Sequence, residues 1–258
     1  MTPTYRETLL RLRGAQKGAA RSAPAYSRFV NRRLGRYLAA LAFKWGWTAN
    51  QVTAVSALWT YTGVALLVLV PVSWWLGVAV SGCLVLGYAL DSADGQVARL
   101  TGSGGPAGEW LDHMVDAVKV VALPLALAVG AYRFDAQPRW WLVVPMVNAV
   151  ASSVLFFGMM LTEQLRRQHG VRSVARTGGR APWLRSVLVL PADYGVMCLS
   201  FLLLGATTVF GLVYVALTAA LLAFCAAAAG AWFRQMGSLS PPRSPERTRV
   251  PAEGEAVR

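Results

Sequence analysis

Long apolar runs alternate with short polar stretches along most of the chain. Each run is close to the ~20 residues that a helix needs to cross a bilayer, and glycine, proline or charged residues separate it from the next. The runs predict spans over about 48–70, 72–94, 108–132, 140–161, 186–209 and 211–233. We therefore expect an all-α polytopic membrane protein with six transmembrane helices.

A different pattern precedes the first span, directly after Pro24. Here Arg28, Arg32 and Arg36 follow one another at four-residue steps, and the apolar residues recur at the spacing of another helix face. These apolar positions are Tyr26, Val30, Leu34, Tyr37, Leu38 and Leu41. A helix with one basic and one apolar face is typical of a segment on an anionic membrane surface. We expect an amphipathic juxtamembrane helix that leads into the first span.

The two ends of the chain have compositions that do not build a core. Residues 1–25 mix Arg, Lys, Gly, Ala and Ser, and residues 237–258 are rich in Pro, Ser, Arg and Glu. We expect a flexible basic arm at 1–25, a membrane domain at 26–236 and a disordered tail at 237–258. The first stretch lacks the short apolar core of a cleaved signal peptide, so none is expected.

Basic residues are distributed unevenly between the two sides that six spans would define. The arm, Arg99, the stretch 163–185 and the tail fall on one side, whereas Arg133 and Arg139 fall on the other. Positive charge accumulates on the cytoplasmic side of membrane proteins. The pattern therefore predicts that both termini lie in the cytoplasm.

The composition agrees with a membrane protein and narrows the range of partners. Of 258 residues, 55% are hydrophobic and 14% are charged, and the mean hydropathy of +0.45 is too high for an ordinary soluble domain. The formal net charge of +13 comes without a nucleic-acid-binding motif, so no nucleic acid is expected as a partner. The three cysteines lie inside apolar runs and imply no disulfide.

Four aspartates stand between apolar runs, where charge is costly and usually functional. Asp91 and Asp94 are three residues apart, and Asp112 and Asp116 are four apart, so each pair shares one face of a helix. The second and third spans run antiparallel, and the two pairs can face each other. Carboxylates that meet in such a setting stay charged when they bind hard divalent cations. We expect two Mg²⁺ or Mn²⁺ ions.

The segment between the two pairs is suited to phosphate. Glycines at 95, 102, 104, 105 and 108 provide a flexible turn and leave backbone N–H groups accessible. Arg99 adds a guanidinium, which forks onto phosphate oxygens. Metal ions and phosphate are therefore expected together.

This stretch resembles the signature of the CDP-alcohol phosphatidyltransferase family, D-x2-D-G-x2-A-R-x8-G-x3-D-x3-D. The matching positions are Asp91, Asp94, Gly95, Ala98, Arg99, Gly108, Asp112 and Asp116. The resemblance implies an integral membrane transferase of phospholipid biosynthesis. Such an enzyme moves a phospho-alcohol group, usually phosphatidyl, from a CDP-linked donor to a hydroxyl acceptor and releases CMP. The resemblance also implies a homodimer whose active site opens to the cytoplasmic leaflet.

The resemblance suggests a role for each matched residue. Asp91, Asp94 and Asp112 would anchor the two divalent ions. Asp116 would be a partial metal ligand and the general base for the acceptor hydroxyl. The residues assigned to the nucleotide and its phosphates are Gly95, Ala98, Arg99 and Gly108.

A shorter element opens the first span at residues 48–53. It resembles the T-P-N-x-x-T element of many family members, with Ala49 in place of the proline. An ordinary helix N-terminus capped by Thr48 or Asn50 explains these residues equally well.

Candidates for binding the acceptor lie outside the signature. Lys119 follows on the face of Asp112 and Asp116, and is either a partner of the site or a lysine that snorkels to the interface. Asp193 is ionisable within the fifth span, although a basic partner at the interface would also explain it. The remaining candidates, which positive-inside topology also explains, are Arg176, Arg180 and Arg185.

Two cues to the substrate conflict. The sequence GEWLDHMVD, with Glu109 and His113, resembles that of family members that use CDP-choline or CDP-ethanolamine. The arginine-rich stretch favours an anionic acceptor instead. On a helix, His113 points about 100° away from Asp112, so a packing or supporting role is expected for it. The donor and the acceptor alcohol both stay open.

Two other functions also place aspartates in a membrane. A membrane prenyltransferase holds magnesium and diphosphate on two acidic clusters, but those clusters are far apart in sequence. A divalent-cation transporter commonly has duplicated halves, and no second acidic motif occurs in this chain. Formation of CMP from a CDP-linked lipid would distinguish the transferase from both.

Overall fold

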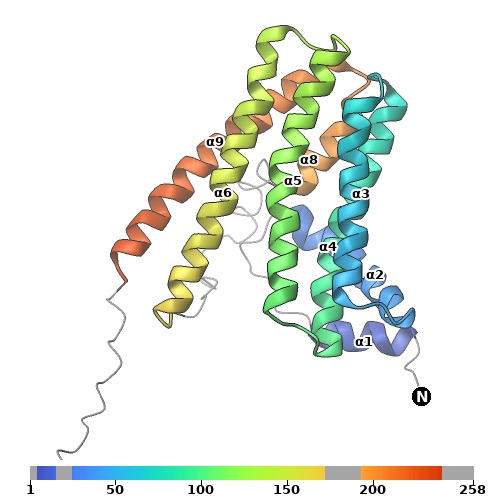
Figure 1. Ribbon diagram of the computed structural model, residues 1–258, viewed down its shortest axis with the longest axis vertical. Coiled ribbons are helices and arrows are strands. Elements are labelled where there is room, and N and C mark those ends of the chain that lie inside the picture. Colours follow the sequence, from blue (N-terminus) through green and yellow to red (C-terminus); the bar gives the residue numbers. More distant parts are fainter. Residues whose placement is uncertain (1–4, 16–24, 172–192, 240–258) are drawn as a thin grey trace, which may run out of the picture.

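The computed structural model describes residues 5–15, 25–171 and 193–239, and this part of the chain is helical without any strand (Figure 1). The elements are α1 (Tyr5–Ala15), the π-helical turn η1 (Ser27–Asn31), α2 (Arg32–Lys44), α3 (Ala49–Leu69), α4 (Trp74–Thr101), α5 (Pro106–Arg133), the 3-10 turn η2 (Arg139–Leu142), α6 (Val143–Gln168), α8 (Tyr194–Ser200), the 3-10 turn η4 (Phe201–Leu203) and α9 (Thr207–Gly237). The expected all-α class is therefore confirmed for this part of the chain.

Five helices of the described chain are long and apolar enough to cross a membrane. They are α3, α4, α5, the continuous η2 and α6, and α9. The expected fifth span at 186–209 cannot be compared over its whole length, because its first residues lie outside the described chain. Its described part is a short apolar helix, Tyr194–Leu203, which continues into α9 through a turn. The structure thus supports five of the six expected spans.

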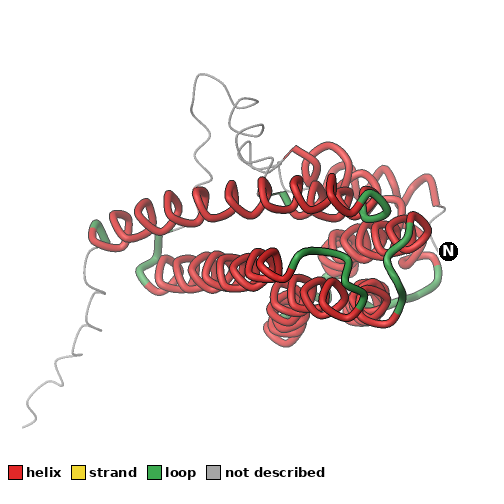
Figure 2. The backbone as a smooth tube through the Cα atoms, turned by 90° about the horizontal axis from the view of Figure 1, so that it is seen from above, coloured by secondary structure: helices red, strands yellow, loops and turns green. Residues whose placement is uncertain are grey.

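The long helices form two groups that meet along α5. Helix α3 packs against α4 and α5, and α6 packs against α5 and α9. In Figures 1 and 2, α6 and α9 run side by side and diverge from the other group toward the end where α4 leads into α5. We call this end of the bundle the motif end. At the opposite end, α3 leads into α4 and α5 leads into α6.

The turn between α4 and α5 makes the two helices antiparallel neighbours at the motif end. Gly102 ends α4 with a φ of 66°, in the left-handed region that glycine adopts without strain. Pro106 starts α5 at its first helical position, where proline lacks no hydrogen bond that the helix needs. The residues that flank this turn are therefore held on facing helices.

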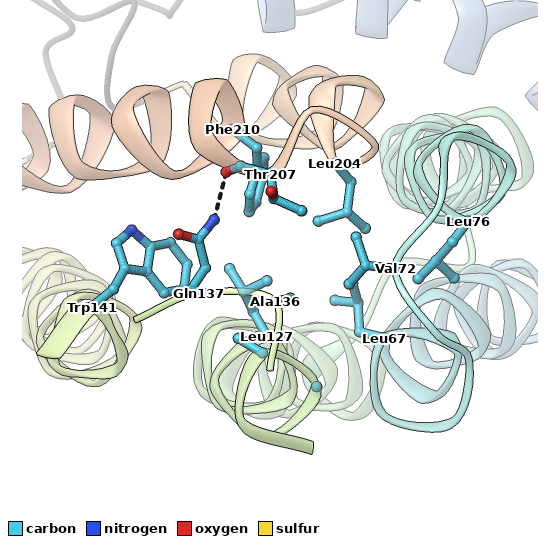
Figure 3. A pocket seen from close by; sticks show the side chains of 12 residues that line it. Leu67, Val72, Leu76, Leu127, Ala136, Gln137, Trp141, Leu204, Thr207 and Phe210 are labelled. Atoms are coloured by element: carbon cyan, nitrogen blue, oxygen red, sulfur yellow. Dashed lines mark hydrogen bonds between the residues drawn. The ribbon is translucent and has the colours of Figure 1, made fainter. Parts of the chain in front are cut away.

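The opposite end contains the main core. Trp141, Phe201, Phe210 and Tyr214 pack together there, with ring centroids of successive contacting pairs 5.5 to 6.3 Å apart. Trp141 Nε1 also donates to the carbonyl oxygen of Gly211 at 3.2 Å. Trp141 and Phe210 border a small apolar cavity between α4, α5 and α9, where the Gln137 amide donates to the Thr207 carbonyl oxygen (Figure 3). This packing joins the two helix groups.

The amino-terminal stretch differs from the expected flexible arm. Residues 5–15 form α1, which packs on α2 and α4, and Thr8 and Leu12 are buried there. Thr8 and Leu12 are four residues apart and so share the face of α1 that is buried. Residues 1–4 and 16–24 lie outside the described chain, as does the expected tail from residue 240 onward.

Helix α2 lies close to α4 through a small residue. A Cβ on Gly35 would lie 2.8 Å from Ser92 Oγ, so close contact between the two helices needs glycine at that position. The expected apolar face is only partly exposed: Leu34 and Tyr37 are 40% and 52% exposed, whereas Leu38 and Leu41 are half-buried. An exposed apolar face beside a basic one is the arrangement that suits a membrane surface.

Candidate functional site

The candidate site lies on the facing surfaces of α4 and α5 at the motif end. Asp91 and Asp94 belong to the last three turns of α4, and Asp112 and Asp116 to the first three turns of α5. Spacings of three and four residues place each pair on one helix face. Because the Gly102 turn reverses the chain, the two faces meet.

Three of the four carboxylates converge. One oxygen from each of Asp91, Asp112 and Asp116 lies within 4.8 Å of the other two. All three side chains are half-buried. Three carboxylates this close repel one another unless cations lie among them. The arrangement suits a hard divalent cation, which prefers oxygen ligands.

The fourth carboxylate, Asp94, lies beside this group rather than in it. It is 6% exposed, and the hydroxyl of Thr53 donates to its Oδ2 at 2.6 Å. The Gly95 backbone N–H donates to its Oδ1. Asp94 is also close enough to Asp91 and Asp112 for their charges to interact. Helix α3 therefore contributes Thr53 to the site.

Lys119 supplies a cation to the cluster. Its Nζ lies 2.5 Å from Asp116 Oδ1 and 3.5 Å from Asp91 Oδ1, and the side chain is 5% exposed. The ring of Tyr194 covers the ammonium from another side, with its centroid 5.3 Å from Nζ. Of the two expectations for Lys119, a partner of the site fits this geometry, because the ammonium points into the cluster.

Glycines open the surface beside the carboxylates. A Cβ on Gly95 would lie 3.4 Å from a guanidinium nitrogen of Arg99, which is itself exposed one turn later on α4. A Cβ on Gly108 would lie 3.2 Å from Asn50 Oδ1. Half-buried Ala98 is the other small residue of this surface. A phosphate could approach backbone, guanidinium and amide groups together here.

The element at residues 48–53, which opens α3, caps the helix and also contacts the site. Thr48 caps the helix in a capping box: Gln51 N–H donates to Thr48 Oγ1 at 3.3 Å, and Gln51 Oε1 accepts from Thr48 N–H at 2.9 Å. The same first turns place Asn50 against Gly108 and Thr53 against Asp94. Helix capping and a place in the site are therefore compatible.

His113 lies at the edge of the site. Its ring nitrogens are 3.8 Å from Glu109 Oε1 and 3.9 Å from Asp112 Oδ2, and the ring stands edge-on to Phe156. These distances exceed a hydrogen bond. Arg167 of α6 donates to Glu109 at 2.9 Å and so ties α6 to α5 beside His113. This geometry agrees with the expected packing or supporting role.

Asp193 is almost fully buried, at 1% exposed, and its described partners are backbone groups. Oδ2 accepts from the N–H of Tyr26 at 2.8 Å and of Ser27 at 3.4 Å, and Oδ1 accepts from Gly195 N–H at 3.0 Å. The carboxylate thus caps α8 and also holds the helical segment that leads into η1. Its geometry explains a buried charge without either a substrate or a basic partner.

The other acceptor candidates cannot be placed. Arg176, Arg180 and Arg185 lie outside the described residues.

Two residues that contribute to the site, Thr53 and Tyr194, had no individual role assigned from the sequence. Thr53 ends the 48–53 element, which was a usable signal. Nothing local marks Tyr194, because its contact with Lys119 joins residues far apart in the chain.

Comparison with known proteins gave one finding. A family model described as CDP-alcohol phosphatidyltransferase matches residues 46–236. This match begins just before α3, ends within α9 and includes the whole candidate site. A search among curated proteins returned no match.

Proposed function

Because the chain belongs to the CDP-alcohol phosphatidyltransferase family, we propose that it transfers a phosphatidyl group from a CDP-linked lipid to a hydroxyl acceptor and releases CMP. Membership of the family makes it a transferase of CDP-alcohols in phospholipid synthesis. The observation that carries the proposal within the structure is the convergence of Asp91, Asp112 and Asp116 beside a glycine-lined surface.

The residues of the cluster fit divalent ions. The donor atoms are carboxylate oxygens, which Mg²⁺ and Mn²⁺ prefer over nitrogen or sulfur ligands. Asp91, Asp94, Asp112 and Asp116 would hold two such ions. When bound, the ions neutralise phosphate oxygens and stabilise the CMP that leaves.

The protein's own groups bind and orient the reactants. Arg99 and Asn50 flank the glycine surface and would contact the pyrophosphate of the donor, while Gly95 and Gly108 allow it close to the backbone. Ala98 leaves room beside it. The interaction with Arg99 fixes the nucleotide end, so the phosphorus that carries the alcohol faces the carboxylates.

Asp116 is the proposed general base. The acceptor hydroxyl gives its proton to the Asp116 carboxylate while its oxygen bonds to phosphorus, and the bond between that phosphorus and the bridging oxygen of CMP breaks. The 2.5 Å contact with Lys119 Nζ orients the carboxylate. A carboxylate among cations is a weak base, so its contribution is mainly one of position.

The topology proposed from the sequence has six crossings. Helix α6 ends at the motif end, and α9 begins at the opposite end, where Thr207 accepts from Gln137 (Figure 1). A sixth crossing between these two helices would account for this, and Tyr194–Leu203 would form its last part. With basic residues gathered at the motif end, we place that end, the site and both termini in the cytoplasm. We also propose a homodimer.

Release of CMP by the purified full-length chain tests the function. The protein would be offered CDP-diacylglycerol with glycerol phosphate, inositol phosphate, inositol or serine, and separately diacylglycerol with CDP-choline. We expect CMP with one of these pairs in the presence of Mg²⁺ and none after chelation with EDTA. If no pair yields CMP, the transferase proposal is contradicted. The transporter and the prenyltransferase hypotheses both predict that no CMP forms.

A further inference from the structure

Lys119 brings a fixed positive charge into the aspartate cluster. Its Nζ contacts Asp116 and Asp91 at 2.5 and 3.5 Å, and water has almost no access to the side chain. Breaking an ion pair in such a place leaves uncompensated buried charges, which costs several kcal/mol. The positive charge of Lys119 is therefore an integral part of the aspartate cluster.

The far side of the ammonium is closed as well. The Tyr194 ring lies 5.3 Å from Nζ, and an aromatic face attracts a cation. Tyr194 is the first residue of α8, whose N-terminus is capped by Asp193. The same carboxylate accepts from Tyr26 N–H, so the first turn of α8 that carries the ring is tied to the segment before η1.

The charges of the site set how many divalent ions it accepts. Four aspartates and Lys119 together carry a formal charge of minus three. A first divalent ion leaves minus one, which is still favourable for a cation. A second would bring the group to plus one, so it enters against a repulsion unless an anion comes with it. Without Lys119, two ions would leave the group neutral.

We propose that Lys119 sets the metal stoichiometry of the site: the protein binds one divalent ion by itself and the second only together with the pyrophosphate of its donor. Pyrophosphate supplies both the missing negative charge and further oxygen ligands. The inference rests on the proposed function, since it takes the aspartates as metal ligands. Lys119 is thereby a positioning residue that acts through the metal sites and through Asp116.

Binding of Mn²⁺ to the full-length protein in lipid nanodiscs tests the proposal. The electron paramagnetic resonance signal of unbound Mn²⁺ gives the number of ions bound, with and without CDP. CDP without protein corrects for the ions that the nucleotide holds in solution. The variants are Lys119→Met, which removes the charge and leaves an unbranched side chain one heavy atom shorter, and Lys44→Met as a matched control, because Lys44 is exposed at the end of α2.

The wild-type and Lys44→Met proteins should bind one Mn²⁺ without CDP and two with it. The Lys119→Met protein should bind two Mn²⁺ ions without CDP. Its dissociation constant for the second ion should be at least about tenfold lower than that of the wild type without CDP, because a unit positive charge next to the ion is gone. The wild-type titration needs no substitution, so it tests the proposal even if Lys119→Met does not fold.

Two Mn²⁺ ions of similar affinity in the wild type without CDP would overturn the proposal, and so would an unchanged second constant in folded Lys119→Met. Absence of any Mn²⁺ binding would overturn this proposal and the metal role in the proposed function together. If Mn²⁺ binds with the expected stoichiometry but no donor yields CMP, the proposed function is contradicted and the proposal on metal binding is not.

Discussion

At the motif end α4 and α5 meet through charged side chains, whereas at the opposite end the helices meet through aromatic packing. Around Asp91 and Asp116, three carboxylates converge, and the Lys119 ammonium contacts two of them. Around Trp141 and Phe210, rings fill the interior and the indole N–H has its hydrogen bond. Convergent like charges oppose folding, and buried rings favour it. The chain thus separates the place of its chemistry from the place of its stability.

The strongest test of this separation is Asp112→Asn. The change keeps shape and removes one ligand charge, so CMP release should fall at least about a thousandfold, since metal stabilisation of the leaving group is worth several kcal/mol. Thermal denaturation in detergent should show equal or greater stability. Asp135→Asn is the matched control, because Asp135 is an exposed turn residue with a φ of 48°, a conformation that asparagine tolerates. Retention of more than a tenth of the activity in Asp112→Asn would break the comparison.

Trp141→Ala makes the reverse test at the opposite end. The deletion leaves a cavity and removes the indole hydrogen bond to the Gly211 carbonyl oxygen, and should lower the free energy of unfolding by roughly 3 kcal/mol. The turnover number per folded molecule should not change. Its neighbour Trp140 is 68% exposed, against 2% for Trp141, so Trp140→Ala should have little effect on stability. Equal losses in the two variants would show that the aromatic cluster is not the main core.

The Asp193→Ala variant tests whether this buried carboxylate contributes to the stability of the fold or to binding of the acceptor. Loss of the cap leaves backbone N–H groups of Tyr26 and Gly195 unpaired, and should cost about 1–2 kcal/mol of unfolding free energy. Faster hydrogen exchange at Tyr26 and Ser27 should accompany it. The KM for the acceptor should stay within about twofold. A KM several-fold higher with unchanged stability would instead make Asp193 an acceptor ligand.

The smallest expected effect concerns the polar contact between α6 and α9. Asn148 Nδ2 donates to Thr218 Oγ1 at 3.0 Å, and both side chains are buried. A double-mutant cycle of Asn148→Ala and Thr218→Ala should give a coupling energy of about 0.6 kcal/mol, the average for such bonds between membrane helices. Ser153→Ala serves as the control partner, because Ser153 bonds within its own helix. Coupling above about 2 kcal/mol would place much of the stability in this contact.

Helix ends and the face shared by each aspartate pair could be predicted because both depend on nearby residues. Helix α4 begins at Trp74, close to the expected start, since Ser73 caps it by accepting from Leu76 N–H. The position of α1 could not be predicted in this way. Its composition resembles that of a disordered arm, and only the surface of α2 and α4 gives Leu12 a place to be buried.

The sequence by itself determined the all-α class, five of the six expected spans and the identity of the aspartate signature, because a helical period and a residue spacing are local properties. The tertiary structure decided how those parts are used. It grouped Asp116 with Asp91 and Lys119, set Asp94 apart with Thr53, and made Asp193 a cap. These assignments depend on which helix faces meet. The contacts between helix faces depend on packing among residues that are distant in the chain, and a local sequence pattern carries no information about that packing.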